Sequence, residues 1–137
     1  MIKALISSAF LLTCAATPAG AACTQANLAG TWTAYSIGLN GSQLAWVSCN
    51  LVIGPLGAFI GASSSCAASG ETVKVKGALR LSVPAKCAFS GSLTILPARG
   101  TNPIPSLTLS LDKQTAAGVG GANGSGNVFT FLMVRTK

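Results

Sequence analysis

Few residues in this sequence are of the types that carry out acid–base or metal chemistry. Among 137 residues there is no histidine, and the two carboxylates, Glu71 and Asp112, each lie beside a predicted turn. General acid–base catalysis needs such groups positioned together in one cleft. The serines offer no nucleophile elbow either, because Ser90-Gly91-Ser92 lies within a predicted strand. We therefore expect a protein that is not an enzyme and that holds no metal or cofactor.

Aromatic side chains in the first half of the chain are the candidates for ligand binding. Trp32, Trp46 and Phe59 could stack on a flat or sugar-like ligand in the mouth of a β-barrel. Tyr35 and Ser36 could supply polar contacts to the same ligand. Trp32 also suits a purely structural role, because a tryptophan buries a large apolar area and can plug a core.

The chain is basic, with a formal net charge of +7. Three cations, Lys74, Lys76 and Arg80, alternate along one predicted strand and form a basic outer face. Such a face could rest on phosphate or sulfate groups, or it could simply be a solvated surface that discourages edge pairing. No aromatic residues are interleaved with these cations, so we do not expect a nucleic-acid partner.

The N-terminal residues have the features of a cleaved signal peptide. Lys3 precedes a short apolar run over residues 4–12, and Ala19-Gly20-Ala21 supplies the small residues that a signal peptidase recognises. The run is shorter than the roughly 20 residues that a membrane-spanning helix requires. We expect a signal peptide over residues 1–21, a mature protein that does not span a membrane, and a secreted or periplasmic location.

Cysteine usage agrees with export. Of the five cysteines, Cys14 lies in the predicted signal peptide, which leaves Cys23, Cys49, Cys66 and Cys87. An even number of cysteines in an exported chain predicts two disulfides, and three pairings are possible.

After the signal peptide, apolar and polar residues alternate with the period of two that is typical of half-buried strands. In "TVKVKGALRLS" (residues 72–82) the valines and leucines share one face, and in "SLTLSLD" Leu107, Leu109 and Leu111 do the same. Turn residues between such runs predict eight strands, near residues 30–37, 43–53, 58–66, 72–82, 86–96, 106–112, 114–119 and 127–135.

Eight strands joined by short connections hide their edges completely when they close into a barrel. Inward glycines at positions 61, 77 and 91 favour the tight coiling of a barrel wall. We expect one all-β domain over residues 22–137, an eight-stranded antiparallel up-and-down barrel, with a β-sandwich as the alternative. Two segments are expected to be loops, "PARGTNPIP" (97–105) and "GVGGANGSGN" (118–127).

The stretch "LAGTWTAYS" (residues 28–36) resembles the first strand of the calycin barrels, which include lipocalins, avidins and bacterial secreted metalloprotease inhibitors. The resemblance continues through "LVIG" (51–54) and "GAFIG" (57–61) and covers residues 28–66. It implies that Trp32 closes one end of a barrel. The likeness to the inhibitors implies a Cys49–Cys66 disulfide, which leaves Cys23 to pair with Cys87. The later tryptophans of an avidin biotin pocket are absent from this chain.

Together these observations predict an exported, non-enzymatic binding protein with a small-molecule or glycan ligand in the barrel mouth. The alternative is a protein-binding module, such as a secreted protease inhibitor or a cell-envelope or surface component. Such a module could use the N-terminal segment, the 97–105 connection or the last strand. That strand, residues 127–135, is apolar on both faces, which suits a homo-oligomer contact as well as a central place in a sandwich.

Overall fold

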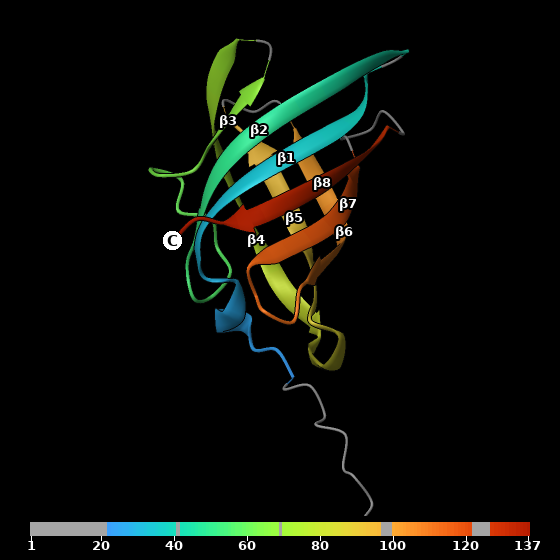
Figure 1. Ribbon diagram of the computed structural model, residues 1–137. Coiled ribbons are helices and arrows are strands. Elements are labelled where there is room, and N and C mark those ends of the chain that lie inside the picture. Colours follow the sequence, from blue (N-terminus) through green and yellow to red (C-terminus); the bar gives the residue numbers. More distant parts are fainter. Residues whose placement is uncertain (1–21, 41, 69, 97–99, 122–126) are drawn as a thin grey trace, which may run out of the picture.

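The computed structural model describes residues 22–137 except 41, 69, 97–99 and 122–126, so the predicted signal peptide lies outside the described residues. Eight antiparallel strands follow one another around a closed barrel, each hydrogen-bonded to the next, and β8 pairs back onto β1 (Figure 1). The strands are β1 (Gly30–Asn40), β2 (Gln43–Ile53), β3 (Ser65–Ala68), β4 (Glu71–Val83), β5 (Ala88–Ile95), β6 (Thr101–Leu109), β7 (Thr115–Gly121) and β8 (Val128–Arg135). This confirms the up-and-down barrel and excludes the sandwich.

Both disulfides join the predicted partners, Cys23 with Cys87 and Cys49 with Cys66. The second links directly paired residues of β2 and β3 inside the barrel wall. No helix in the described part of the chain is long and apolar enough to cross a membrane.

The alternating pattern decides which side chains form the core. Along β4 the inward Val75 and Leu79 are buried, while Lys76 and Arg80, which directly follow them, are exposed, as the period of two requires. Leu107 and Leu109 are buried as predicted, but the prediction for Leu111 is wrong, since its side chain is 86% exposed. The alternation stops there because β6 ends at Leu109 and a turn follows.

That turn is organised by the carboxylate of Asp112. It accepts hydrogen bonds from the Ser110 hydroxyl (2.5 Å) and from the backbone N–H of Gln114 (3.0 Å). These two bonds lower the pKa of Asp112 below its ordinary value of 3.8, and the bond from the Ser110 hydroxyl has the larger effect. Lys113 takes a left-handed conformation at φ 60°. Asp112 is therefore a turn residue, as its sequence context suggests.

The wall between β2 and β4 departs from the predicted strand at 58–66. The strand β3 covers residues 65–68, beside the middle of β2. Between the last residues of β2 and the strand β4, residues 57–59 take the place of a longer β3. They make isolated bridges from Phe59 to Ile53 and from Ala58 to Ala78. Backbone bonds from Phe59 N to Gly77 O and from Leu79 N to Gly57 O, both 2.9 Å, attach this segment to β4.

The glycine at position 57 makes that close approach possible. Its φ is +83°, and a Cβ atom there would lie 2.0 Å from the carbonyl oxygen of Leu79. Only a residue without a side chain fits. The segment 57–59 thus completes a wall that β3 alone leaves short.

The two predicted loops are shorter than expected. The strand β6 begins at Thr101 and includes Pro103, which pairs with Ser92, and Pro105, which lies in a register irregularity with β5 between Ile104 and Leu107. Prolines are tolerated at such irregularities, because the ladder there does not need their missing N–H groups. The strand β7 extends to Gly121, so the first glycines of the second predicted loop pair with β8.

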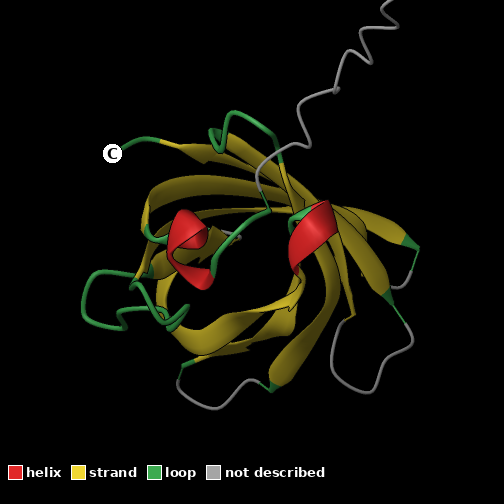
Figure 2. Cartoon of the chain, turned by 90° about the horizontal axis from the view of Figure 1, so that it is seen from below, coloured by secondary structure: helices red, strands yellow, loops and turns green. Residues whose placement is uncertain are grey.

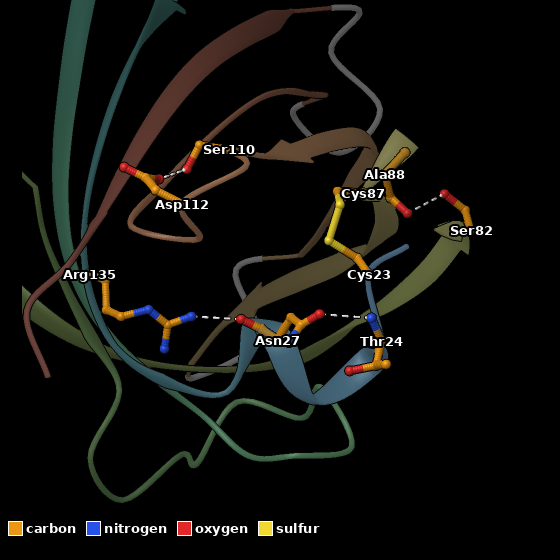
Figure 3. The surroundings of a disulfide bond; sticks show 9 residues. All are labelled: Cys23, Thr24, Asn27, Ser82, Cys87, Ala88, Ser110, Asp112 and Arg135. Atoms are coloured by element: carbon orange, nitrogen blue, oxygen red, sulfur yellow. Dashed lines mark hydrogen bonds between the residues drawn. A yellow bond between two sulfur atoms is a disulfide. The ribbon is translucent and has the colours of Figure 1, made fainter. Parts of the chain in front are cut away.

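One end of the barrel is closed by the short 3-10 helix η1 (Gln25–Leu28), and η2 (Pro84–Lys86) lies at the same end (Figure 2). The Gln25 side chain bridges two backbone groups of β4, donating to Leu79 O (3.0 Å) and accepting from Leu81 N (2.7 Å). The Cys23–Cys87 disulfide ties the start of η1 to the residue before β5 (Figure 3). This end is therefore covered by peptide that the disulfide holds in place.

Trp32 and Arg135 form the centre of the closed end. The indole is fully buried, and its Nε1 donates to Leu28 O at 2.9 Å. The Arg135 guanidinium lies 4.3 Å from the centre of a Trp32 ring and donates to the carbonyls of Ala29 and Asn27. Partial burial lowers the pKa of Arg135 below its ordinary value, yet an arginine stays charged at any physiological pH.

Candidate functional site

Above the closed end, the barrel contains a cavity of about 230 Å³. Its existence follows from the inward side chains of β1. After the large Trp32, the inward positions hold Ala34, Ser36 and Gly38, so the strand loses side-chain volume toward the other end of the barrel. Gly38 is a separate case, because its missing Cβ makes room for the paired residue of β8: an added Cβ would lie 2.8 Å from the Cβ of Phe129. The small residues of β1 leave a space that the opposite wall does not fill.

The rest of the cavity wall is made mainly of aliphatic and aromatic side chains, so the cavity is strongly apolar. Among the described residues that line the cavity, the polar side chains are those of Ser36 and Asn102, and none of these lining residues carries a charge. The apolar lining residues of β5, β6 and β8 are Leu93, Ile95, Ile104, Phe129, Phe131 and Met133.

Sulfur atoms also contribute to this lining. Cys49 and Cys66 both border the cavity, so their disulfide forms part of the inner surface between β2 and β3. Phe59, on the segment that seals the wall beside β4, is 6% exposed and lines the cavity as well. The Cys49–Cys66 bridge and the 57–59 segment therefore shape the same space.

The structure separates the residues that the sequence groups into one binding site. Phe59 and Ser36 line the cavity, whereas Trp32 is the structural plug of the closed end. Tyr35 and Trp46 do not line it, because their side chains lie on the outer surface and are 57% and 69% exposed. The expectation that all five share the barrel mouth is corrected here.

The reason for the correction is the period of two itself. Successive residues of a strand point to opposite faces, so Tyr35 cannot enter the space that Ser36 enters. On β2, Trp46 lies between Ala45 and Val47, and both of these line the cavity. The inward residues of β1 are small, and small residues alone do not indicate a ligand site in a sequence. The outward aromatic residues do, and this is why the sequence favours them as binding residues.

Sequence reasoning does not single out most of the cavity lining. The signal that could have found it is the decreasing size of alternate residues along β1, from Trp32 to Gly38. Asn102 could not have been found in this way, because the sequence predicts a loop at its position and the structure places it in β6. Its contribution depends on where β6 begins.

The basic outer face is present on β4, and part of it has a structural role. The side chains of Lys74, Lys76 and Arg80 are exposed. Lys74 donates to Ala62 O (2.9 Å) and Arg80 donates to Leu56 O (2.5 Å). Two of the three cations therefore hold the segment between β2 and β3 against the barrel.

The arrangement of carboxylates supplies no acid–base pair. Glu71 begins β4, and Asp112 lies in the turn after β6, at the closed end where β4 finishes. Across the described ranges, the structure contains no group of three or more His, Cys, Asp or Glu side chains that could hold a metal ion.

A second hollow, of about 330 Å³, lies on the outer surface across β2, β1 and β8. Tyr35, Ile37, Trp46 and Leu132 border it. The hollow lies within a larger surface of exposed hydrophobic side chains on β7, β8, β1 and β2, which we call the apolar face: Tyr35, Ile37, Leu39, Leu44, Trp46, Val119, Val128, Leu132 and Val134. Each of these is more than a third exposed. Leu39, near the end of β1, also borders the cavity.

Comparison with known proteins adds no functional assignment to this geometry. A scan against protein-family models finds no match for this chain, and searches of curated proteins and of solved structures find no similar chain.

Proposed function

We propose that this protein is an exported, non-enzymatic binding protein that holds a small, neutral, apolar ligand inside its barrel. The observation that carries the proposal is the cavity itself, which is about 230 Å³ in volume and lined mainly by hydrophobic side chains. Pockets that combine an apolar surface with a few polar groups are the usual form of small-molecule sites.

The chemistry of the lining selects the ligand class. A charged ligand would lose its hydration without gaining a counter-ion, which costs several kcal/mol. A glycan would lose water from many hydroxyl groups, while the cavity offers two polar side chains, Ser36 and Asn102. The lining therefore favours a neutral hydrophobic molecule with one or two polar atoms over a sugar.

The size of the cavity limits the ligand further. An apolar cavity of about 150 Å³ in a protein core accepts benzene. A ligand somewhat larger than benzene, with roughly ten non-hydrogen atoms, suits the present space. At about 0.5 kcal/mol per atom, within the range for small ligands, its dissociation constant would be on the order of 100 µM to 1 mM.

Export is the second part of the proposal. Two disulfides join all four cysteines outside the predicted signal peptide, and such bridges persist in oxidising compartments such as the periplasm or the extracellular space. The sequence of residues 1–21 supports a cleaved signal peptide. The resemblance of residues 28–66 to calycin barrels agrees with ligand carriage in the barrel and stands as part of the same proposal.

The proposal is tested by titrating the disulfide-bonded protein with 2-naphthol, a neutral bicyclic probe, while recording methyl signals by NMR. We expect saturable shifts at Leu93, Ile104 and Met133, which line the cavity. The substitution Ala45→Phe places a ring into the space and should abolish these shifts. Shifts confined to surface residues, or absent altogether, would refute the proposal.

The control for that substitution is Ala62→Phe. Ala62 is exposed, lies in the segment between β2 and β3 and does not line the cavity, so the same change of side chain leaves the space open. The Ala62→Phe protein should bind the probe as the unmodified chain does. Equal loss of binding in both variants would also contradict a site inside the barrel.

A further inference from the structure

We propose that the apolar face is a homodimer interface, in which two copies of this chain pack β7-β8-β1-β2 against β7-β8-β1-β2. The proposal does not depend on the cavity or its ligand. It rests on the continuity of the face, on its lack of charge, on the position of the cations and on its area.

The strand register makes the apolar face continuous. One row across the sheet consists of Val119, Thr130, Ile37 and Trp46, which are directly paired from each strand to the next. In the adjacent row, Leu132 of β8 pairs with Tyr35 of β1. Outward residues in paired positions lie side by side on one surface. The hydrophobic side chains of the face are therefore neighbours and not scattered single residues.

The face is free of ionic groups, in contrast to the rest of a strongly basic chain. Its nine side chains carry no charge at neutral pH, while the formal net charge of the chain is +7. Two copies of so basic a protein repel each other wherever their cations meet. An uncharged surface is the place where a second copy can approach without that penalty.

The basic outer face points away from the apolar face. In the closed order of eight strands, β4 lies four strands from β8 in either direction, so Lys74, Lys76 and Arg80 are on the opposite side of the barrel. A protein that docks on an anionic membrane needs its cations around the apolar surface that enters the lipid. Lys113 and Lys137 contact Arg135 of β8 and Thr31 of β1 at the closed end, so the described cations near the apolar face gather at one end of it. This arrangement favours a second copy over a lipid surface.

The size of the face fits a dimer. Exposed fractions between 38% and 69%, applied to aliphatic and aromatic side chains, give an exposed hydrophobic area of roughly 800–1,000 Å². A stable interface buries about 800 Å² on each partner, whereas the largest apolar patch of a typical monomer is about 300–600 Å².

The hollow beside Trp46 supplies the complementary shape. In a two-fold symmetric contact each copy presents the same surface, so a protruding group must meet a recess on that surface. Trp46 is 69% exposed and borders the hollow between Tyr35, Ile37 and Leu132. We infer that Trp46 of each copy packs into the hollow of the other, which makes it the central anchor.

The test is sedimentation velocity on the disulfide-bonded protein over about 1–100 µM, compared with the variants Trp46→Arg and Leu111→Arg. Leu111 is 86% exposed but lies in the β6–β7 turn, outside the apolar face. Leu111→Arg therefore introduces the same positive charge away from the proposed interface. We expect a dimer of the unmodified chain and of Leu111→Arg, and a dimer dissociation constant that Trp46→Arg raises about 30-fold or more.

A measurement without mutation accompanies it. Trp32 is buried in the closed end, so a change in tryptophan emission with protein concentration reports on Trp46. Dimer formation should shift the emission of Trp46 to shorter wavelength. If Trp46→Arg fails to fold, this shift in the unmodified chain still tests whether a dimer forms through Trp46.

Three outcomes overturn the proposal. These are a monomer of the unmodified chain at 100 µM with unchanged emission, a dimer that persists in folded Trp46→Arg, and a monomer that floats with phosphatidylcholine–phosphatidylglycerol vesicles. The last outcome would assign the apolar face to a lipid surface instead.

Discussion

Replacing Gly57 by alanine tests whether residues 57–59 seal the barrel wall, and Gly70 provides the matched control. Both glycines have a φ of +83°, so alanine meets the same backbone strain at each position. At Gly70 an added Cβ meets no atom within 4 Å, whereas at Gly57 it lies 2.0 Å from Leu79 O. At Gly57 the added Cβ also lies 2.4 Å from Gln25 Nε2, so the difference between the two variants measures the crowding of residue 57 against β4 and against the Gln25 side chain that bridges β4.

The magnitude follows from the bonds that the clash disturbs. Alanine in the left-handed region costs about 1 kcal/mol, and we expect this loss for Gly70→Ala. To relieve the clash, Gly57→Ala must also move the segment away from β4 and weaken its two backbone hydrogen bonds to that strand. At about 1 kcal/mol for each bond, the total loss for Gly57→Ala becomes about 3 kcal/mol.

Urea unfolding with linear extrapolation measures both losses. A larger loss at Gly57 should be accompanied by weaker binding of 2-naphthol, because Phe59 is carried by the same segment and lines the cavity. Equal losses of stability in the two variants would refute the reasoning, since backbone strain alone would then account for both.

Three further predictions concern the closed end and its nearby turn. Replacing Cys23 and Cys87 together by alanine removes a cross-link between residues 64 positions apart and should lower the free energy of unfolding by about 4 kcal/mol, measured in urea. Arg135→Met should cost about 2–4 kcal/mol in the same assay, because it removes the cation over Trp32 and leaves backbone carbonyls without a donor, and Arg135→Lys should restore little of it. Asp112→Asn should be less stable than the unmodified chain near neutral pH, because the lowered pKa of Asp112 stabilises the folded state above pH about 4. That difference should disappear as the pH falls through the lowered value. A stability difference that stayed constant as the pH fell below about 4 would contradict this account of the turn.

The strands and their inward faces could be predicted from the sequence because both are local properties. Alternation over four to six residues is sufficient to place Val75 and Leu79 in the core and the neighbouring cations of the same strand outside. The same rule, applied strictly, would have separated Tyr35 from Ser36, so the misplaced aromatics were within reach of sequence reasoning.

Other features depend on contacts between distant segments. The wall at residues 57–59 contains two isolated bridges and a loop-like backbone, and its attachment to β4 has no local pattern. The cavity arises where small residues of β1 face large residues of β5 and β6 across the barrel, which requires knowing that these strands share one barrel. The apolar face likewise becomes visible only when the register brings outward residues of four strands together.

The pairing of β8 with β1 has a consequence for how the chain reaches its native state. All other neighbouring strands are consecutive in sequence and can form step by step, but the closing contacts join distant residues, such as Arg135 and Ala29, which are 106 positions apart. Contacts of such long range slow folding, because the loop entropy is lost before they form. Until they form, β1 and β8 both present open edges next to hydrophobic side chains, and intermolecular pairing competes with closure. We therefore expect refolding yields to fall steeply as protein concentration rises.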